Sequence, residues 1–585
     1  MTDYLSILRQ YWHYDDFRPL QAEIIHSIGS GRDTLALLPT GGGKSICFQV
    51  PAMAMAFSKD QPTYSITGVP DGICLVITPL IALMKDQVLH LKERGIQAVC
   101  LYAGQTVKET AELLDNCQFG HVKFLYVSPE RLESERFRKR LMFLPIAMIA
   151  VDEAHCISQW GYDFRPSYLK IAAVREFFPN APVLALTATA TPEVVDDIQE
   201  KLLFREKNVF RQSFIRSNLS YVVRTCESKP DMLLHILQSV LGSSVVYVRN
   251  RQKTREISDL LNKAGISADF FHAGLMNTDK DAKMQAWKND QTRVMVATNA
   301  FGMGIDKADV RTVIHIDLPD TIEAYFQEAG RAGRDGKRAY AVLLYNRSDH
   351  AKVQKRIADS FPPRDFLKRI YEAVGDYYEV AIGFGEGRRF AFSLNEFCTA
   401  KKLPIIQTFS AITLLAQDGY WDFSEEQETP TRVQIRVTRE QLYKESIYGK
   451  EELLLNFLLR NYTGLFTDPV IIHLDAICSH LQLQPDDLHQ LLVQLAQNGI
   501  ITYIPKRKTP FITYMKDRLP LEMVEINEQQ YELKQERYRQ KLIAMLEYAE
   551  QTHFCRQQLL VGYFGETTAQ TCGCCDVCID AHKLQ

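Results

Sequence analysis

The sequence has no long hydrophobic run and no excess of charge of one sign. Its 585 residues include 68 Lys and Arg against 71 Asp and Glu, which gives a net charge of −3. No uninterrupted apolar stretch is long enough to span a bilayer, and no basic-then-apolar leader follows Met1. Because there is no global positive field, any surface for nucleic acid must be local. We expect a soluble, cytoplasmic protein with no membrane partner.

Cysteine is sparse along most of the chain and gathers near its end. Five of the thirteen cysteines lie between residues 555 and 578, and the others are scattered singly. Scattered cysteines are typical of small buried side chains in a reducing compartment. With 46% hydrophobic and 24% charged residues, the composition is that of a globular protein. The length requires several domains.

One stretch, TLALLPTGGGKSICFQ (residues 34–49), has the pattern of a phosphate-binding loop. A strand-like segment, a glycine-rich turn and a predicted helix follow in an order that directs backbone N–H groups and a helix dipole at an anion. Lys44 would add charge at the β/γ-phosphates, and the Ser45 hydroxyl would ligate Mg²⁺. The predicted nucleotide contacts of the loop are Thr40, Gly41, Gly42, Gly43, Lys44 and Ser45. Leu38 replaces the first glycine of the full G-x-x-x-x-G-K-[ST] pattern, so an ordinary glycine-rich turn remains an alternative.

Several predicted strands end in polar motifs and alternate with predicted helices, a pattern typical of a parallel sheet covered by helices. The strand at 147–151 runs directly into Asp152 and Glu153. Functional residues in such sheets gather at the carboxyl ends of the strands. Asp152 is placed to hold Mg²⁺ through water, and Glu153 is placed to orient or deprotonate the attacking water. A random acidic turn is the alternative.

A segment before the glycine-rich turn carries candidate base contacts. The Gln21 amide suits the N6/N7 edge of adenine, and the Tyr14 ring suits stacking on the same base. A helix cap and a surface amide are the alternative.

A loop directly after the two carboxylates holds Trp160, Phe164 and Arg165 without a helix or strand period. Aromatic rings beside a guanidinium grip single strands by stacking. Such a loop would couple strand binding to hydrolysis. Aromatic side chains buried in a core are the ordinary alternative.

A second α/β pattern begins near residue 208 and has no phosphate-binding loop of its own. Its glycine-rich segment at 330–336 carries Arg331 and Arg334, three residues apart. An arginine donated from a second lobe to the γ-phosphate makes hydrolysis depend on closure of the two lobes. A surface basic pair is the alternative.

Over residues 4–344 the chain resembles the RecQ family of superfamily 2 DNA helicases. The resemblance is carried by FRPLQ, PTGGGKS, TPLIALMKDQ, YVSPERL, DEAHCISQWGYDFRP, LTATAT, ATNAFGMGIDK and QEAGRAGRDG. It implies ATP-driven 3′-to-5′ translocation on single-stranded DNA by two RecA-like lobes, with roles in recombination and repair. Two residues depart from the family pattern: His13 stands where glycine is usual, and Tyr162 where histidine is common.

The resemblance also implies roles for individual residues. Trp160, Phe164 and Arg165 would belong to the family's aromatic-rich loop, which links DNA to ATP. Arg334, rather than Arg331, would be the arginine finger. The adenine-recognition motif would comprise Tyr14, Arg18 and Gln21.

The segment from 360 to 527 separates the second lobe from the C-terminal cysteines and contains one pattern twice. Two helices followed by a hairpin are the signature of a winged helix. The predicted first unit has helices at 394–402 and 408–417 and a hairpin from 420–421 and 433–437; the second has helices at 474–481 and 488–497 and a hairpin from 500–504 and 511–515.

The two predicted hairpin tips differ in charge. The first tip, at 424–429, carries three glutamates, which phosphates repel, whereas the second carries Lys506, Arg507 and Lys508. We predict that the second tip contacts DNA and that the first makes protein contacts. The alternative is that the basic residues only solvate a turn.

The C-terminal cysteines follow a long charged helix and have the spacing of a metal site. Cys572-x-x-Cys575-x-x-Cys578 and the more distant Cys555 supply the four thiolates of a closed tetrahedral Zn²⁺ site, which would be structural because no coordination position stays open. Cys574 is surplus, and the spacing favours Cys575 over it. The CRQQLL and YFGE segments resemble the family's zinc module. A redox pair is the alternative.

The sequence therefore predicts an α/β protein with two tandem RecA-like parallel-sheet lobes, winged-helix-like domains and a small helical zinc module. The expected divisions are lobe 1 (1–207), lobe 2 (208–350), a linker helix with the first winged-helix-like unit (351–446), the second such unit (447–526), and the long helix with the zinc module (527–585).

The expected activity is ATP-dependent 3′–5′ DNA unwinding, with ATP, Mg²⁺ and Zn²⁺ as cofactors and single-stranded and duplex DNA as partners. The protein would be associated with the nucleoid if its source is bacterial. The expected catalytic residues are Lys44, Asp152, Glu153, Gln327, Arg331 and Arg334, and Asp306 joins the nucleotide contacts. Two alternatives are a nucleic-acid remodelling translocase without processive unwinding and a DNA-binding scaffold with weak ATPase activity. The full catalytic set speaks against the scaffold.

Overall fold

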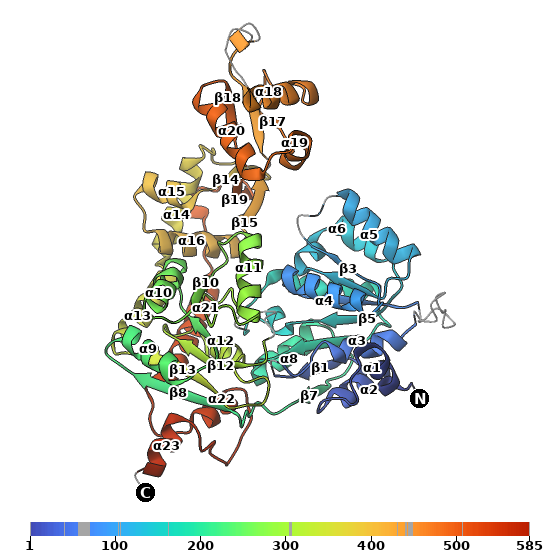
Figure 1. Ribbon diagram of the computed structural model, residues 1–585, viewed down its shortest axis with the longest axis vertical. Coiled ribbons are helices and arrows are strands. Elements are labelled where there is room, and N and C mark those ends of the chain that lie inside the picture. Colours follow the sequence, from blue (N-terminus) through green and yellow to red (C-terminus); the bar gives the residue numbers. More distant parts are fainter. Residues whose placement is uncertain are drawn as a thin grey trace. The chain divides into compact units, whose positions relative to one another are not determined.

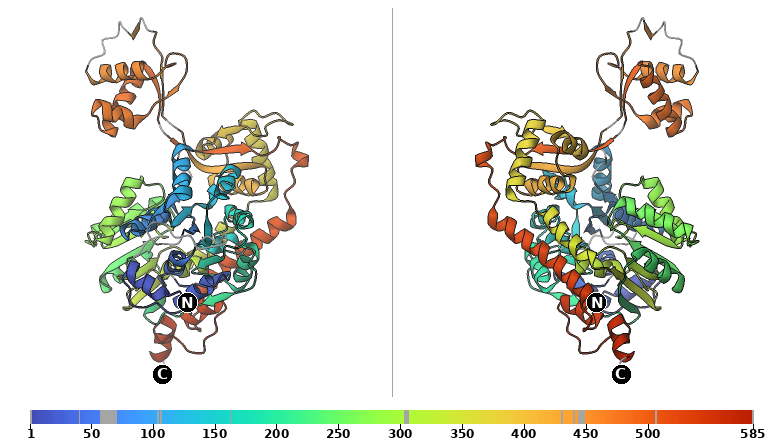
Figure 2. Two further views of the ribbon diagram at one scale, coloured as in Figure 1. Left: turned by 90° about the vertical axis from the view of Figure 1, so that its right-hand side faces the viewer. Right: turned by 90° about the vertical axis from the view of Figure 1, so that its left-hand side faces the viewer.

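The computed structural model describes residues 2–39, 41–56, 71–102, 105, 107–161, 163–302, 307–429, 431–438, 441–442, 449–505 and 507–583. The chain forms two compact units (Figure 1, Figure 2). The first comprises residues 1–353 and 538–585, and the second comprises residues 354–537. Among the helices in these described ranges, none combines the length and the apolar character that crossing a membrane requires.

Lobe 1 is built on a seven-stranded sheet in the order β3-β4-β2-β5-β6-β1-β7, with neighbouring strands parallel. The strands are β1 (Thr34–Leu37), β2 (Ile73–Ile77), β3 (Ala98–Leu101), β4 (Phe124–Val127), β5 (Ile146–Val151), β6 (Val183–Thr187) and β7 (Val209–Arg211). The helices are α1 (Tyr4–Trp12), α2 (Gln21–Gly29), α3 (Ile46–Ala54), α4 (Ile81–Glu93), α5 (Val107–Phe119), α6 (Glu135–Leu141), α7 (Ile171–Phe177) and α8 (Pro192–Lys201), with short 3₁₀ turns at Pro129–Glu133, Ala154–Ile157 and Pro166–Lys170.

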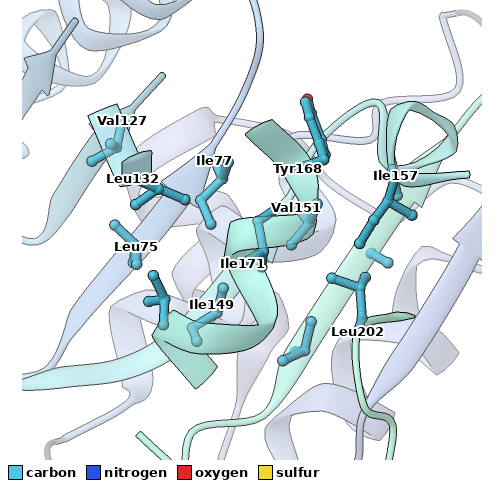
Figure 3. Close-up of a cluster of buried hydrophobic side chains, with 14 of the residues drawn as sticks. Leu75, Ile77, Val127, Leu132, Ile149, Val151, Ile157, Tyr168, Ile171 and Leu202 are labelled. Carbon is cyan, nitrogen blue, oxygen red and sulfur yellow. The ribbon is translucent and has the colours of Figure 1, made fainter. Parts of the chain in front are cut away.

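The central strands of this sheet are apolar throughout because helices cover both of its faces. Successive residues of β1 point to opposite faces, so Leu35 and Leu37 enter one hydrophobic core and Ala36 enters the other. Figure 3 shows the first core, in which Leu75 of β2 and Ile149 of β5 take part. The two cores fix the strand ends at one edge of the sheet, where the polar motifs lie.

Lobe 2 repeats this architecture with six parallel strands in the order β10-β11-β9-β12-β13-β8. The strands are β8 (Leu219–Thr225), β9 (Ser243–Tyr247), β10 (Ala268–Phe271), β11 (Val294–Ala297), β12 (Val310–His315) and β13 (Ala339–Tyr345). The helices are α9 (Lys229–Ser239), α10 (Arg251–Lys263), α11 (Asn277–Lys288), α12 (Ile322–Ala329) and α13 (Ser348–Ser360). The prediction of two parallel-sheet lobes is confirmed.

The C-terminal part of the first unit packs on lobe 2. It contains the end of α21 (Glu528–Glu550), α22 (Arg556–Tyr563) and α23 (Asp576–Lys583). Arg556 is 2% exposed and forms an ion pair of 3.0 Å with Asp576. The same Asp576 carboxylate accepts a hydrogen bond of 3.2 Å from the Val223 backbone N–H of β8. A buried charge that is paired on both sides holds the segment against the sheet.

The second unit contains two small antiparallel sheets, β14-β19-β15 and β17-β16-β18. Its strands are β14 (Arg389–Ala391), β15 (Trp421–Thr429), β16 (Arg432–Ile435), β17 (Val470–Ile471), β18 (Ile501–Ile504) and β19 (Arg507–Tyr514). Its helices are α14 (Arg364–Tyr377), α15 (Leu394–Lys401), α16 (Ile405–Gln417), α18 (Lys450–Asn461), α19 (Leu474–Leu481) and α20 (Pro485–Gln497), with a 3₁₀ turn at Leu521–Met523.

The predicted pairing of the two hairpins was wrong. Strand β15 pairs with β19, and Figure 1 shows them side by side, whereas β16 pairs with β18. The second winged helix is therefore inserted between the two strands of the first one's wing. Two separate cores hold this arrangement: Trp421 and Ile512 share one, and Val433 and Ile501 share the other. The prediction assumed that strands adjacent in sequence pair with each other. It failed because an inserted domain separates the two paired strands in sequence.

The correction changes the interpretation of the two charged tips. The strand register aligns Glu428 with Lys508 and Thr429 with Arg507, so the acidic and basic segments belong to adjacent strands of one ribbon rather than to two separate wings. Lys506 lies outside the described residues. Contact of residues 506–508 with DNA stays a prediction.

Candidate active site

A cleft of about 890 Å³ in the first unit is lined by both lobes. The predicted site residues that line it are Tyr14, Arg18, Gln21, Gly41, Gly43, Lys44, Ser45, Asp152, Glu153, Gln327, Arg331 and Arg334. Gly42 lies in the same turn, where its N–H donates to the Pro39 carbonyl at 2.9 Å. Thr40 and Asp306 lie outside the described residues. The structure therefore brings residues far apart in sequence to one place.

The glycine-rich turn connects β1 to α3 and depends on glycine at two positions. Gly41 and Gly43 have φ values of 84° and 76°, a left-handed conformation that other residues adopt at a cost. A Cβ atom on Gly43 would lie 2.4 Å from Gln21 Nε2, so a side chain has no room there. The turn is thus held close to the start of α2.

Gln21 and Arg18 fasten the preceding segment to this turn. Gln21 Nε2 donates to the carbonyl oxygens of Gly42 and Gly43 at 3.2 and 3.0 Å, and Gln21 Oε1 accepts from the Arg18 N–H at 2.9 Å. The Arg18 guanidinium donates to a third carbonyl of the same turn. The Gln21 amide therefore positions the turn in this structure. Recognition of adenine by Gln21 and by Tyr14, which is 51% exposed, stays a prediction.

The two carboxylates lie at the end of β5, as predicted. Glu153 Oε1 is 4.0 Å from Lys44 Nζ. Asp152 accepts hydrogen bonds from the Glu153 N–H at 3.0 Å and from the Thr78 hydroxyl at 3.4 Å. Burial, followed by the neighbouring Glu153 carboxylate, raises the pKa of Asp152 to about 6. A cation placed beside this pair would relieve their repulsion and favour the ionised form.

Gln87 orients Ser45, a contact that was not predicted. Gln87 Nε2 donates to the Ser45 hydroxyl oxygen at 2.9 Å, and Gln87 Oε1 accepts from the Tyr126 hydroxyl at 3.0 Å and from Gln49 Nε2 at 3.2 Å. The TPLIALMKDQ motif contains Gln87, which was the available signal. A hydroxyl and a carboxylate at one edge of the cleft are the oxygen donors that Mg²⁺ prefers, so Ser45 and Asp152 fit that ion.

His155 connects the ends of two strands behind the carboxylates. Its Nδ1 lies 2.9 Å from the Thr187 hydroxyl oxygen and 3.4 Å from Glu153 Oε2. Burial lowers the pKa of His155 to about 3, so the ring is neutral at physiological pH. Sequence analysis gave this residue no role.

Lobe 2 contributes two arginines and Gln327 to the cleft. Arg334 lies against the glycine-rich turn: a Cβ atom on Gly41 would be 3.5 Å from its Cγ and Cδ. Arg331 is 4% exposed, and Gln327 is buried on α12. Arg334 of lobe 2 thus lies beside the glycine-rich turn of lobe 1, and its role as an arginine finger stays a prediction.

The aromatic loop follows the carboxylates and leaves Trp160 accessible, with 44% of its surface exposed. Phe164 is half-buried. The Arg165 guanidinium pairs with Asp163 at 3.1 Å, which fixes its orientation inside the loop. Tyr162 lies outside the described residues. Stacking of the Trp160 ring on bases stays a prediction.

The structure also brings Cys555, Cys572, Cys575 and Cys578 together, with their sulfur atoms all within 4.8 Å of one another. Four thiolates about 2.3 Å from a tetrahedral Zn²⁺ would be about 3.8 Å apart, so the cluster has the size and donors of that site. The surplus Cys574 instead places its sulfur 4.0 Å from the Leu219 carbonyl oxygen.

Comparison with family models matches four segments of the chain. The DEAD/DEAH box helicase model matches residues 18–198, and the model of the helicase conserved C-terminal domain matches residues 228–336. The model of the RecQ helicase winged-helix domain of Bacteroidota matches residues 433–505, and the RecQ zinc-binding model matches residues 515–579.

Three curated relatives give the same assignment. The ATP-dependent DNA helicase RecQ of Haemophilus influenzae is 39% identical over 64% of this chain and 59% of its own length. The RecQ protein of Bacillus subtilis is 41% identical over 59% of this chain and 56% of its own length. The probable ATP-dependent DNA helicase RecS of Bacillus subtilis is 40% identical over 59% of this chain and 67% of its own length.

The chain belongs to the RecQ family. It spans less than two thirds of the length of the first two RecQ proteins. The zinc-binding segment of the family includes the cysteine cluster, which is a Zn²⁺ site. The winged-helix match coincides with the inserted unit from β16 to β18, so that unit is similar to the winged-helix domain of Bacteroidota RecQ helicases.

Proposed function

We propose that this RecQ-family chain couples ATP hydrolysis to 3′-to-5′ movement along single-stranded DNA and thereby unwinds duplex DNA. One observation carries the proposal: the cleft has Lys44 and Glu153 on one side and Arg334 on the other, with Arg334 against the glycine-rich turn. The names of the relatives, ATP-dependent DNA helicases, support the same activity.

In the proposed reaction, lobe 1 binds the triphosphate and prepares the nucleophile. Lys44 places its charge at the β/γ-phosphates, and the glycine-rich turn surrounds them with backbone N–H groups. Ser45 and Asp152 would hold Mg²⁺, and the bound ion would neutralise phosphate charge. Glu153 accepts the proton of the attacking water or orients it.

Lobe 2 completes the site in the proposed mechanism. Arg334 stabilises the charge that develops on the γ-phosphoryl group, and Arg331 and Gln327 support it from the same lobe. Because these groups come from a second lobe, hydrolysis proceeds only when the lobes close. Opening and closing of the lobes then becomes movement along the bound strand.

The aromatic loop is the proposed contact with single-stranded DNA. Trp160 and Phe164 stack on bases, and Arg165 interacts with the strand, without reading its sequence. The loop begins right after Glu153, so a displaced loop shifts the water-activating residue. The basic residues 506–508 are proposed as a duplex contact, and the proposed cellular roles are recombination and repair. In a bacterial source, this work would take place in the cytoplasm at the nucleoid.

The test is ATP hydrolysis and strand separation by the wild type beside Lys44→Ala, on tailed duplexes of both polarities. We expect DNA-stimulated hydrolysis and unwinding from a 3′ tail, with loss of hydrolysis on the order of 10²–10³-fold in Lys44→Ala. Stimulated hydrolysis without strand separation would favour a remodelling translocase. DNA binding without hydrolysis would favour a scaffold. An RNA duplex of the same length checks the choice of nucleic acid.

A further inference from the structure

Lys541, in the C-terminal half of α21, contacts both lobes at once. Its Nζ donates to the carbonyl oxygens of Trp160 and Gly161 at 2.8 and 2.9 Å. The same Nζ is 3.7 Å from Glu323 Oε1. The Lys541 side chain is 20% exposed and the Glu323 side chain 4% exposed, so water screens this contact far less than a surface ion pair.

The two ends of this contact belong to the parts that the proposed mechanism must connect. Trp160 and Gly161 lie in the aromatic loop, shortly after the 3₁₀ turn (Ala154–Ile157) that follows Glu153. Glu323 lies in the first turn of α12, and Gln327 follows one helical turn later on the same face. The chain then continues to the lobe 2 arginines.

A second residue of the zinc-stabilised segment, Tyr563 of α22, lies near Glu323 and is influenced by its carboxylate. Burial, together with that carboxylate, raises the pKa of Tyr563, so the phenol remains a donor. Glu323 is therefore paired with Lys541 of the C-terminal segment, and Lys541 also binds the loop backbone.

We propose that Lys541 is a positioning residue that couples the aromatic loop to α12, so that single-stranded DNA bound at Trp160 aligns Gln327 and the lobe 2 arginines. The inference rests on the proposed function and assigns the C-terminal segment a part in it. An ammonium group has three donors, and here it faces two carbonyl oxygens and one carboxylate. With Lys541 removed, this contact between the loop and α12 is lost while every residue of the nucleotide cleft remains.

The test uses the full chain with its zinc and oligo-dT as the DNA. ATP hydrolysis is measured without DNA and across a range of oligo-dT concentrations for wild type, Lys541→Met and Lys541→Arg. We expect Lys541→Met to keep the rate without DNA and to lose about tenfold of the maximal stimulated rate, with the half-saturating oligo-dT concentration little changed. Lys541→Arg, which keeps the charge, should recover most of the stimulation.

Lys207→Met is the matched control, because Lys207 forms an exposed ion pair with Asp196 at 2.6 Å. It should leave both rates unchanged. If Lys541→Met hydrolysed ATP faster than wild type without DNA and kept the same maximal DNA-stimulated rate, Lys541 would inhibit hydrolysis, and the proposal would be overturned. An unchanged maximal rate would overturn it too.

A second variant guards against a folding defect. Glu323→Gln keeps the side-chain shape and removes the charge from the other end of the contact. We expect the same selective loss of DNA stimulation. The double variant with Lys541→Met should lose no more of the stimulated rate than the more severe single variant does. Independent, additive losses would overturn the coupling. If wild type itself shows no DNA-stimulated hydrolysis, the proposed function fails, which is a result distinct from a Lys541 variant that behaves as wild type.

Discussion

Replacement of Glu153 by Gln removes the predicted base and leaves the rest of the cleft intact. Glu153 Oε1 lies 4.0 Å from Lys44 Nζ and Oε2 lies 3.4 Å from His155 Nδ1, so an amide of the same shape fits the position. General-base catalysis contributes about 10²–10⁴-fold to rate. At about 1.36 kcal/mol for each factor of ten, the barrier rises by about 2.7–5.4 kcal/mol. Nucleotide affinity should change little, because the turn and Lys44 still hold the phosphates.

The assay for Glu153→Gln is single-turnover ATP hydrolysis with saturating oligo-dT, paired with equilibrium binding of a fluorescent ATP analogue. Glu206→Gln is the control, because the exposed Glu206 forms a surface ion pair of 2.6 Å with the exposed Arg32. Hydrolysis by Glu153→Gln at the rate of the Glu206→Gln control would refute its role as the base. Loss of analogue binding together with hydrolysis would also refute the reasoning, since it would make Glu153 a binding residue.

Three further predictions concern stability, zinc and DNA. The Asp33 carboxylate is fully buried and accepts a hydrogen bond from the Arg175 guanidinium. Asp33→Ala should therefore lower the free energy of unfolding by about 3–5 kcal/mol in urea denaturation. A loss near zero would contradict this. Although burial opposes it, hydrogen bonds from arginines and backbone N–H groups lower the pKa of Asp33, so its contribution is complete above the unfolded-state pKa and is lost as pH falls through the folded-state value. Cys575→Ser should release zinc, measured by a chromogenic chelator, while Cys574→Ser retains it; equal release would contradict the ligand set. Charge reversal at residues 506–508 should weaken duplex binding and flatten its salt dependence, and unchanged binding would reject a contact there.

Residues in contiguous motifs could be predicted from sequence because local order determines their place. The glycine-rich turn, Asp152 and Glu153 each follow a buried strand, and parallel strands bring their carboxyl ends to one edge. The cysteine spacing likewise limited the proposed zinc ligands to three cysteines around the start of one helix and one cysteine upstream. In these cases, the spacing of the residues along the chain is enough to predict that they lie close together.

Contacts between distant segments could not be predicted in this way. The pairing of β15 with β19 spans an inserted winged helix, and nothing local marks Arg507 as a partner of Thr429. The Lys541 contact with the aromatic loop joins residues 380 and 381 positions apart. A lysine on a charged helix is indistinguishable in sequence from its solvated neighbours, so only the packing of α21 reveals it.

The most direct test of the account is single-turnover ATP hydrolysis by Arg334→Ala with saturating oligo-dT. The account predicts a loss of about 10³–10⁵-fold with retained binding of an ATP analogue, because the arginine acts on charge that develops in the reaction. Arg338 is exposed and lies four residues after Arg334, so Arg338→Ala should hydrolyse ATP as wild type does. Hydrolysis by Arg334→Ala at the Arg338→Ala rate would contradict a site completed from the second lobe.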